Sequence, residues 1–385
     1  LYGKLLGIVS LVAFLSLGFQ LNELIGSEGI IPFEQDLIHI QNITENNEFG
    51  ISKYQLRPTL LWALNSDAAL NICLRTGIFA SICIIVGFLQ PFFLLLLWIL
   101  YLSLVVVAEP FLNFQWDSLL LESLLLSVLF VPWMLRNSSK HIIAPLVVSR
   151  WLIWLLLFKV LFESGIVKFT YFSSDGYNAW FNLTALDYHY WTQPLPHQLS
   201  WYLSKMPRFF QQISLFFVYF SELIIPFGIF FPRRIRRITC YFIIAFQLII
   251  MLTGNYGFFN ILIISLAMTL IDDQWFRKGL GKTKLLKKHI TEVIFLSNIK
   301  KILSIAMLTI FIFTFYIYLM KDIKGNRVKS AGISSIRNIE SKLIDFVQRY
   351  RFSNAYGLFR VMTVDRPEIL IETMDEDSIW SVLNF

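Results

Sequence analysis

The sequence has few charged residues, few cysteines and none of the short motifs that mark common catalytic or metal sites. Asp, Glu, Lys and Arg make up 15% of its 385 residues, whereas soluble domains carry about a quarter, which excludes an ordinary soluble domain. Cys73, Cys83 and Cys240 all lie in apolar runs, which excludes a disulfide framework or a CxxC redox pair. Because HExxH and GxSxG are missing, we predict no metal site, no cofactor and no catalytic residue.

The chain instead contains many long runs of apolar residues. Hydrophobic residues make up 56% of the chain and aromatic residues 16%, and a membrane-spanning helix needs about 20 mostly apolar residues. Pro91 lies between two runs and cannot continue the preceding helix, which indicates a tight helical hairpin. The sequence predicts an all-α polytopic membrane protein with about nine transmembrane helices. The predicted spans are Leu1–Leu21, Ala69–Leu89, Phe92–Ala108, Leu119–Leu135, Ala144–Phe162, Phe210–Phe231, Ile238–Leu252, Phe258–Ile271 and Ile302–Met320.

Lys and Arg are concentrated in a few connections between the apolar runs, which predicts the orientation of the helices. They gather at 136–150, 233–237 and 277–301. An odd number of spans places these connections on one side, which the positive-inside rule makes cytoplasmic. The net charge of +7 is therefore a feature of membrane topology, and we predict a lipid bilayer and no nucleic acid as partner. The segments on the lumenal or exterior side are 22–68, 109–118, 163–209, 253–257 and 321–385.

The composition divides the chain into two parts. Residues 1–320 form a multi-helix transmembrane domain, and residues 321–385 form the first part of an extramembrane domain. Apolar positions recur with helical spacing over 336–350, which predicts an amphipathic surface helix. Segments 356–363 and 368–373 predict two strands joined by a proline turn. Two strands are too few for an independent sheet, so we expect this small β-rich domain to be incomplete and the chain to belong to a longer protein.

The most aromatic connection is Phe162–Pro196, within the lumenal loop 163–209. It follows an apolar run without a break and places Trp180, Trp191 and other rings around an acidic residue and a histidine. Amphipathic rings settle at the interface between membrane and water. The segment therefore predicts an ordered loop at the bilayer surface.

Charged side chains near the outer ends of two predicted helices form a candidate polar cluster. Lys159 and Glu163 lie four residues apart on one helix face, so they can pair. Two interpretations remain open. In the structural one, the lysine reaches toward the interface and its neighbour neutralises it; in the catalytic one, His189 acts with Asp187 or Glu163 as a general acid–base pair. The cluster comprises Asp117, Glu122, Lys159, Glu163 and Lys168.

Two polar residues lie deep inside predicted spans. Glu222 is near the middle of Phe210–Phe231, where an acidic side chain costs about 2.5–3.5 kcal/mol on insertion scales. Gln247 lies at a similar depth on the next span, so the two side chains can meet. Such a pair either fixes helix packing or forms a polar core for protons or a ligand. Transport is the weaker hypothesis because the sequence shows no inverted repeat.

Several long motifs resemble one protein family. FESGIVKF begins at Phe162, W-x-NLTALDYHYWTQPLP begins at Trp180, and TGNYGFFN and LIDD follow. These segments resemble the lipase maturation factor family of multi-pass membrane proteins. The resemblance implies an endoplasmic reticulum membrane protein, or a cytoplasmic membrane protein in a bacterium, that assists the folding and assembly of secreted lipases.

The same resemblance implies which surface contacts the client. The lumenal loop and the region after Tyr356 are the client-facing segments, and the partner is a secreted lipase. A more distant similarity, to the membrane domain of vitamin K-dependent carboxylase-like proteins, implies the alternative of a membrane-embedded enzyme acting on a lipid or protein at the outer leaflet. The client-facing residues implied are Trp180, Asp187, Tyr188, His189, Tyr190, Trp191 and Pro194.

Overall fold

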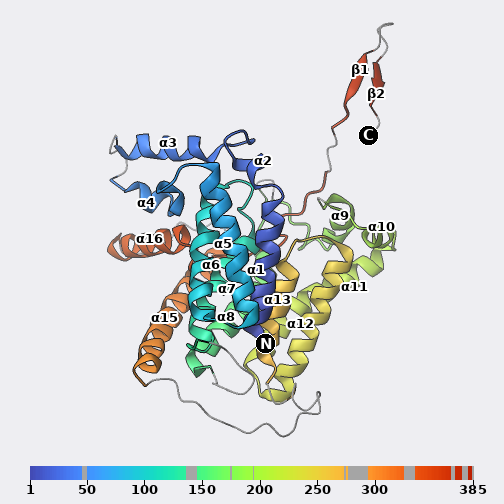
Figure 1. Cartoon of the computed structure of the whole chain (residues 1–385). Helices are drawn as coiled ribbons and strands as arrows, with labels where there is room; N and C mark the ends of the chain where they lie inside the picture. The colour runs from blue at the N-terminus through green and yellow to red at the C-terminus, as the bar shows by residue number, and fades with distance from the viewer. Residues whose placement is uncertain are drawn as a thin grey trace.

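The computed structural model is a bundle of long helices with smaller helices gathered at one end (Figure 1). It describes residues 1–45, 50–135, 145–173, 176–193, 195–272, 275, 294–324, 334–365, 369–374 and 380–383. The helices of the bundle are α1 (Tyr2–Gly18), α5 (Asp67–Val86), α6 (Gln90–Val107), α7 (Gln115–Phe130), α8 (Val147–Thr170), α11 (Arg208–Tyr219), α12 (Arg233–Thr253), α13 (Phe259–Ala267) and α15 (Ile294–Lys324).

The other elements are turns that continue these helices, further helices and a strand pair. A π-helical turn, η2, and a 3₁₀ turn, η3, continue α11, and the 3₁₀ turn η4 continues α13. The remaining elements are α2 (Leu21–Ile25), α3 (Phe33–Glu45), α4 (Lys53–Leu56), η1 (Leu60–Trp62), α9 (Ala185–Thr192), α10 (Gln198–Ser204), η2 (Phe220–Ile224), η3 (Ile225–Phe230), η4 (Met268–Leu270), α16 (Ser334–Arg349), β1 (Glu372–Met374) and β2 (Trp380–Val382).

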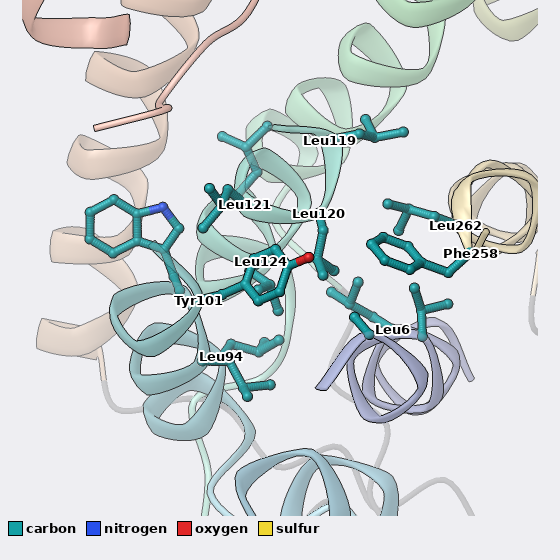
Figure 2. Close-up of a cluster of buried hydrophobic side chains, with 14 of the residues drawn as sticks. Leu6, Leu94, Tyr101, Leu119, Leu120, Leu121, Leu124, Phe258 and Leu262 are labelled. Atoms are coloured by element: carbon teal, nitrogen blue, oxygen red, sulfur yellow. The ribbon is translucent and has the colours of Figure 1, made fainter. Parts of the chain in front are cut away.

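Helix α7 is the centre of the core. It contacts α1, α6, α8, α13 and α15, and its side chains from Leu119 to Leu121 are fully buried. A helix that is apolar on all sides is stable only when neighbours surround it. Figure 2 shows the result: Leu6 of α1, Tyr101 of α6 and Leu262 of α13 converge on the leucines of α7.

The predicted hairpin at Pro91 is present. Helix α5 ends at Gly87, whose φ of 89° is in the left-handed region that glycine adopts without strain. The Gly87 N–H donates to the carbonyls of Cys83 and Ile84, which satisfies the exposed end of the helix. Pro91 then lies in the first turn of α6, where its missing N–H costs nothing.

Five described helices are long and apolar enough to cross a membrane. They are α5, α6, the run from α11 to η3, α12 and most of α15. Helices α1 and α13 are apolar but shorter, α7 has only 16 residues, and α8 contains four charged residues. The multi-pass helical class is confirmed, whereas the count of nine spans is not confirmed by length and composition.

The bundle has two distinct ends (Figure 1). Helices α2, α3 and α4 lie at the upper end of the view, together with α9 and α10. The N-terminus and the turn before α12 lie at the lower end. The arginines of that turn are described, whereas Arg136, Lys140 and most of the predicted basic stretch 277–301 lie outside the described residues.

The region after α15 differs from the prediction. The amphipathic helix is present as α16, which lies across the bundle rather than along it (Figure 1). The predicted strand 356–363 is wrong, because this segment has no strand conformation and Tyr356 is fully buried among the helices. The strand pair lies further on, where β1 pairs antiparallel with β2. The first part of this segment, from Tyr356 to Phe359, instead packs against the bundle, whereas Val361 is exposed.

Candidate functional site

Helix α8 carries three charged side chains into the interior. Lys159, Glu163 and Lys168 all have 0% exposure. Residues four apart share a helix face, whereas nine residues make about two and a half turns and reach the opposite face. The charges therefore form two separate centres on either side of α8. We name them the Lys159 centre and the Lys168 centre.

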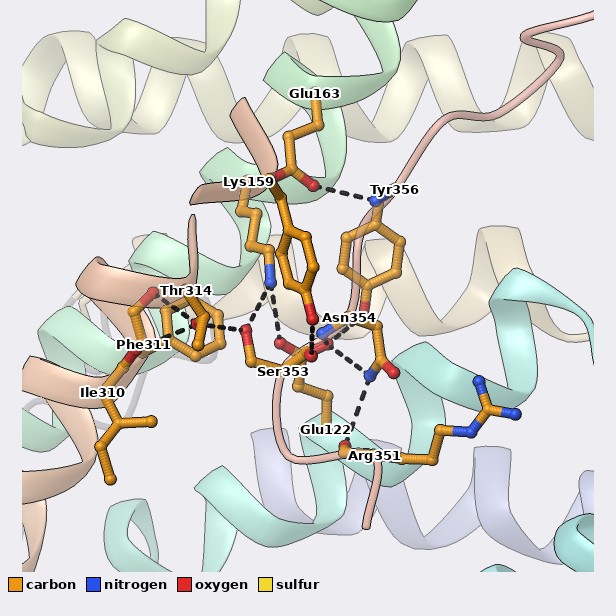
Figure 3. Close-up of polar contacts among 11 residues, drawn as sticks. Glu122, Lys159, Glu163, Ile310, Phe311, Thr314, Arg351, Ser353, Asn354 and Tyr356 are labelled. Carbon is orange, nitrogen blue, oxygen red and sulfur yellow. Dashed lines mark hydrogen bonds and ion pairs between the residues drawn. The ribbon is translucent and has the colours of Figure 1, made fainter. Parts of the chain in front are cut away.

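The Lys159 centre is a buried ion pair within a hydrogen-bond network (Figure 3). The Lys159 ammonium lies 3.3 Å from Glu122 Oε1 and donates to Ser353 Oγ at 2.8 Å. The other carboxylate oxygen, Glu122 Oε2, accepts from Asn354 Nδ2 at 3.1 Å and from the Tyr356 hydroxyl. A buried ion pair is tolerated when such hydrogen bonds satisfy its remaining polar atoms. Three of these partners come from the segment after α16.

Glu163 completes this centre but does not pair with Lys159, contrary to the expectation from their spacing. Its Oε2 accepts from the backbone N–H of Tyr356 at 2.9 Å, while Lys159 pairs with Glu122 on α7. Within the part of the chain that the structure describes, Glu163 Oε1 is buried without a hydrogen-bond partner. The ring of Phe311 from α15 lies over the ammonium, with its centroid 4.6 Å from Lys159 Nζ, which adds a cation–π contact.

The Lys168 centre is a second buried ion pair. Lys168 Nζ lies 2.6 Å from Glu222 Oε2. The ammonium also donates to the carbonyls of Ser164 at 3.0 Å and Leu358 at 3.1 Å. Since an ammonium has three N–H donors, these three contacts use all of them. The ring of Trp180 lies 4.9 Å from the same nitrogen and shields it.

Local backbone geometry brings Glu222 to Lys168. Glu222 lies in η2, and single π-helical turns are frequent at functional sites because they shift one side chain relative to the helix. Gly165 of α8 permits the close approach: a Cβ there would lie 2.6 Å from Leu223 Cδ2 and 3.1 Å from Glu222 Cβ. The glycine of the FESGIVKF motif is therefore required by the contact between α8 and η2.

A neutral hydrogen-bond chain connects the aromatic segment to the turn after α12. Tyr256 Oη lies 3.1 Å from His189 Nε2 and donates to Gln193 Oε1 at 2.9 Å. Gln193 Nε2 in turn donates to the carbonyl of Thr253 at 2.8 Å. Burial, together with the charge of Lys168, lowers the pKa of His189 to about 4. The imidazole is therefore neutral at physiological pH.

A cavity of about 460 Å³ lies between α8, α9, α11, α12 and α13. Its walls are mostly apolar, and a few polar side chains converge on it, which is the usual character of a small-molecule site. The Lys168 centre and the His189 chain both contribute to its lining. The polar lining residues include Ser164, Lys168, His189, Glu222, Gln247, Tyr256 and Asn260.

The residues of the aromatic segment divide into buried and exposed groups. Trp180 and Tyr190 are buried, in a small cluster with Tyr219, whose hydroxyl donates to the Trp180 carbonyl at 2.8 Å. Tyr188 is half-buried and Trp191 is 40% exposed. Asp187 lies in the first turn of α9, half-buried. Pro194 lies outside the described residues.

The other predicted residues have different partners from those expected. Asp117 accepts a hydrogen bond from the Tyr101 hydroxyl at 2.6 Å, at the start of α7, and joins neither centre through an ion pair. Glu222 pairs with Lys168, whereas Gln247 accepts from Asn260 Nδ2 at 2.8 Å. Glu222 and Gln247 nevertheless line the same cavity. The partner of His189 is Tyr256, so the acid–base pairs with Asp187 or Glu163 stay hypotheses.

Sequence reasoning missed the segment Ser353–Phe359 as a source of functional partners. It supplies contacts to both centres, and its Phe359 carbonyl accepts from Trp180 Nε1 at 2.7 Å. The family resemblance drew attention to the region after Tyr356 as a client-facing surface, but no pattern in the sequence indicated that the segment enters the bundle. Among the described residues, no group of three or more His, Cys, Asp or Glu side chains is placed to hold a metal ion.

Comparison with known proteins gives a consistent result. The family model described as "Lipase maturation factor transmembrane domain" matches residues 1–278. Lipase maturation factor 2 of Xenopus tropicalis is 38% identical over 279 residues, which cover 69% of this chain and 38% of that protein. The Gallus gallus protein of the same name is 36% identical over 323 residues, covering 77% of this chain and 42% of the relative.

A second group of relatives carries a related name. Lipase maturation factor 1 of Mus musculus is 32% identical over 276 residues, covering 70% of this chain and 47% of the relative. The chain thus spans less than half the length of these relatives. No solved structure shows a significant match. With the family model matched over most of the multi-helix region, the chain belongs to the lipase maturation factor family.

Proposed function

We propose that this chain is the membrane part of a maturation factor that assists the folding and assembly of secreted lipases in the endoplasmic reticulum. The observation that carries the proposal is the family match over residues 1–278. Because the chain spans less than half of its relatives, the client and the compartment are part of the proposal. The carboxylase-like alternative has no support from the relatives found.

The surface formed by α9 and α10 is the proposed client contact. Trp191, Trp201 and Tyr202 are 40%, 57% and 56% exposed, and Tyr188 lies next to Trp191 with ring centroids 6.4 Å apart. Exposed aromatic side chains in a group mark interaction surfaces. Trp180 and Tyr190 support this surface from beneath, because both are buried. We call Tyr188, Trp191, Trp201 and Tyr202 the client surface.

The proposed topology has about nine spans. Helices α1, α7, α8 and α13 with η4 would cross in addition to the five long apolar helices. The 24 residues of α8 measure about 36 Å at 1.5 Å per residue, enough for the hydrocarbon core of a bilayer. Lys159, Glu163 and Lys168 of α8 are paired or hydrogen-bonded inside the protein, so they do not face lipid. In this topology α9, α10 and the strand pair are lumenal.

The proposed domain boundary follows the buried segment rather than α15. Tyr356 is part of the main hydrophobic core, and Tyr350, Phe352 and Leu358 pack against it. Residues up to about Phe359 therefore belong with the helical bundle, and the extramembrane domain would begin after them. The exposed pair β1–β2 would be its first element.

A complementation experiment tests the proposal: the protein is expressed in cells that lack their own lipase maturation factor, and lipase secretion is measured. The full-length protein should restore secreted lipase activity, and lipase should co-purify with it. Replacing Trp191 and Trp201 together with Ser should reduce both, because it removes the two largest exposed rings of the client surface.

A matched variant controls for general loss of aromatic surface. Tyr54 of α4 is 58% exposed and lies at the same end of the bundle but away from α9 and α10 (Figure 1). Tyr54→Ser should leave secretion and co-purification unchanged. Equal co-purification of lipase with the wild type and the Trp191→Ser/Trp201→Ser variant would reject the client surface. Failure of the full-length protein to restore any lipase would reject the function itself.

A further inference from the structure

The cavity beside the Lys168 centre opens toward the lipid. Phe210 and Ile213 of α11 and Ile249 of α12 line it, and these side chains are 41%, 50% and 47% exposed. Both helices belong to segments long and apolar enough to span a bilayer. Exposed apolar side chains on such helices face hydrocarbon, so the mouth of the cavity lies between α11 and α12 and faces the membrane.

The shape of the cavity fits a chain rather than a compact solute. Its lining extends along α11 and η2 from Phe210 to Glu222, a rise of about 18 Å at 1.5 Å per residue. Helices α11 and α12 contact each other at Phe217 of α11, whose ring centroid lies 5.5 Å from that of Phe242 and 6.0 Å from that of Phe246. The volume of about 460 Å³ lies within the range of known ligand pockets.

The charges of the lining favour an uncharged head group. Lys168 and Glu222 neutralise each other, and all three N–H donors of Lys168 are used. Among the residues that the structure describes, no arginine lines the cavity, and His189 is neutral at physiological pH because burial and Lys168 lower its pKa to about 4. A phosphate placed here would be desolvated without an opposite charge, which is costly.

Glu222 and His189 each keep a polar atom for a ligand within the described part of the chain. Glu222 pairs with Lys168 through Oε2, which leaves Oε1 as an acceptor for a hydroxyl. His189 bonds Tyr256 through Nε2, which leaves Nδ1. Both side chains line the cavity. Both atoms are acceptors, because the Tyr256 hydroxyl gives its hydrogen to Gln193 and the Nε2 of His189 is then the donor. They suit a small head group that donates a free hydroxyl, and Gln247 Nε2, also in the lining, is a donor for a neighbouring ester.

We propose that this cavity binds an uncharged glycerolipid of the diacylglycerol type, which enters from the bilayer between α11 and α12. One acyl chain would lie along the apolar wall of α11 and α12, and the hydroxyl would bond Glu222 or His189. The proposal does not depend on lipase maturation, since it rests on the cavity and its lining alone. It assigns a lipid ligand to a cavity that the described side chains leave open.

Photocrosslinking of the purified full-length protein in nanodiscs tests this site. The probe is a diacylglycerol with a diazirine on one acyl chain. Labelled peptides should map to Phe210–Phe217 and Ile249–Thr253. Excess unlabelled diacylglycerol should reduce labelling about tenfold, whereas phosphatidic acid with the same acyl chains should not compete. Equal competition by the two lipids, or labelling spread over all lipid-facing helices, would overturn the proposal.

Variants of one helix provide the matched comparison. Ile250→Trp fills the cavity from α12 and should reduce labelling about tenfold. Ile238→Trp adds the same ring to the exposed face of α12, where Ile238 is 65% exposed and is not part of the lining, and should label like the wild type. Unchanged labelling of a folded Ile250→Trp protein would overturn the proposal. If Ile250→Trp does not fold, Ile213→Trp takes its place with the same expectation.

A lipid-dependent shift of thermal unfolding gives a readout without crosslinking. A ligand that binds only the folded state raises the unfolding temperature. Diacylglycerol added to the wild-type protein in detergent should raise it, and phosphatidic acid should not. No shift with diacylglycerol at saturating concentration would contradict the site.

Discussion

At the scale of residues, the buried charges of α8 were visible in the sequence but their partners were not. Lys159, Glu163 and Glu222 stand out because charge is rare inside apolar helices. Spacing along one helix suggested the pair Lys159–Glu163, yet partners on other helices replaced it. Those partners, Glu122 and Lys168, depend on how α7, α8 and η2 pack, which a local pattern does not contain.

The Lys159 centre yields the first prediction. Lys159→Met leaves Glu122 buried without its counter-charge, so the free energy of unfolding should fall by about 3–5 kcal/mol. Adding Glu122→Gln should recover a large part of this loss, because the amide keeps the hydrogen bonds without the charge. Unfolding titrations in mixed micelles measure both. Lys301→Met, at an exposed site on α15, should change little, and a double variant as unstable as the sum of its parts would contradict the pairing.

His189 yields a prediction about pH. Its pKa in the folded protein is about 4, below the ordinary value of 6.5. The unfolded state therefore takes up the proton first as the pH falls, so folding loses stability between about pH 6.5 and pH 4 and is unaffected by this group above that window. His189→Gln should remove the part of this loss of stability that protonation of His189 causes. Unfolding temperatures across pH 4–7.5 test it.

An exposed histidine serves as the control for that series. His39 lies on the surface of α3, so His39→Gln should keep the wild-type pH dependence of stability. Identical pH profiles for His189→Gln and the wild type would show that His189 does not titrate as its burial requires.

At the scale of elements, the lengths of the apolar runs and the spacing of apolar, glycine and proline residues predicted the helices well. The reason is that a membrane helix satisfies its backbone hydrogen bonds within itself, so its extent depends on local sequence. The α5–α6 hairpin and α16 were predicted from such signals. The π-helical turn η2 was not, since it depends on contact with Gly165 of α8. The strand predicted at 356–363 failed for a similar reason: Tyr356, Leu358 and Phe359 pack against the helices instead of in a sheet.

The contact between α1 and α5 gives an element-scale prediction. A Cβ on Gly77 would clash with the ring of Phe14, which is fully buried. Gly77→Ala should push the helices apart and lower the free energy of unfolding by about 1–3 kcal/mol. In the background of Phe14→Leu, which makes room, the same substitution should cost little. Equal effects in both backgrounds, measured by thermal unfolding, would exclude this contact as the cause.

At the scale of the whole molecule, the multi-pass class followed from composition alone, because a deficit of charge over so long a chain requires lipid. The exact number of spans did not follow. Helices α7 and α8 carry charge or lack length, and only their packing inside the bundle removes them from lipid. The cavity was also invisible in the sequence, since residues from eight elements, α7 to α13 and η2, build it.

The two-ended arrangement predicts the accessibility of single cysteines. Glu28→Cys and Gln198→Cys should react with a membrane-impermeant maleimide only from the lumenal side, because both exposed sites lie at the end of the bundle that carries α2, α3 and α10. Lys4→Cys and Arg234→Cys should react only from the cytoplasmic side. Microsomes before and after permeabilisation distinguish the two. Labelling of Gln198→Cys and Arg234→Cys from the same side would reject the topology.

Because Ser353–Phe359 lies between the helices, truncation of the chain before this segment would disturb the interior of the bundle. This stretch supplies a hydroxyl and an amide to Glu122, a backbone N–H to Glu163 and a carbonyl to Lys168. A cut after α15 would thus remove hydrogen-bond partners from Glu122, Lys159, Glu163 and Lys168 in the interior of the bundle. The strand pair β1–β2 follows this segment in the chain, so force or binding at the strand pair would act on the hydrogen bonds of the buried charges.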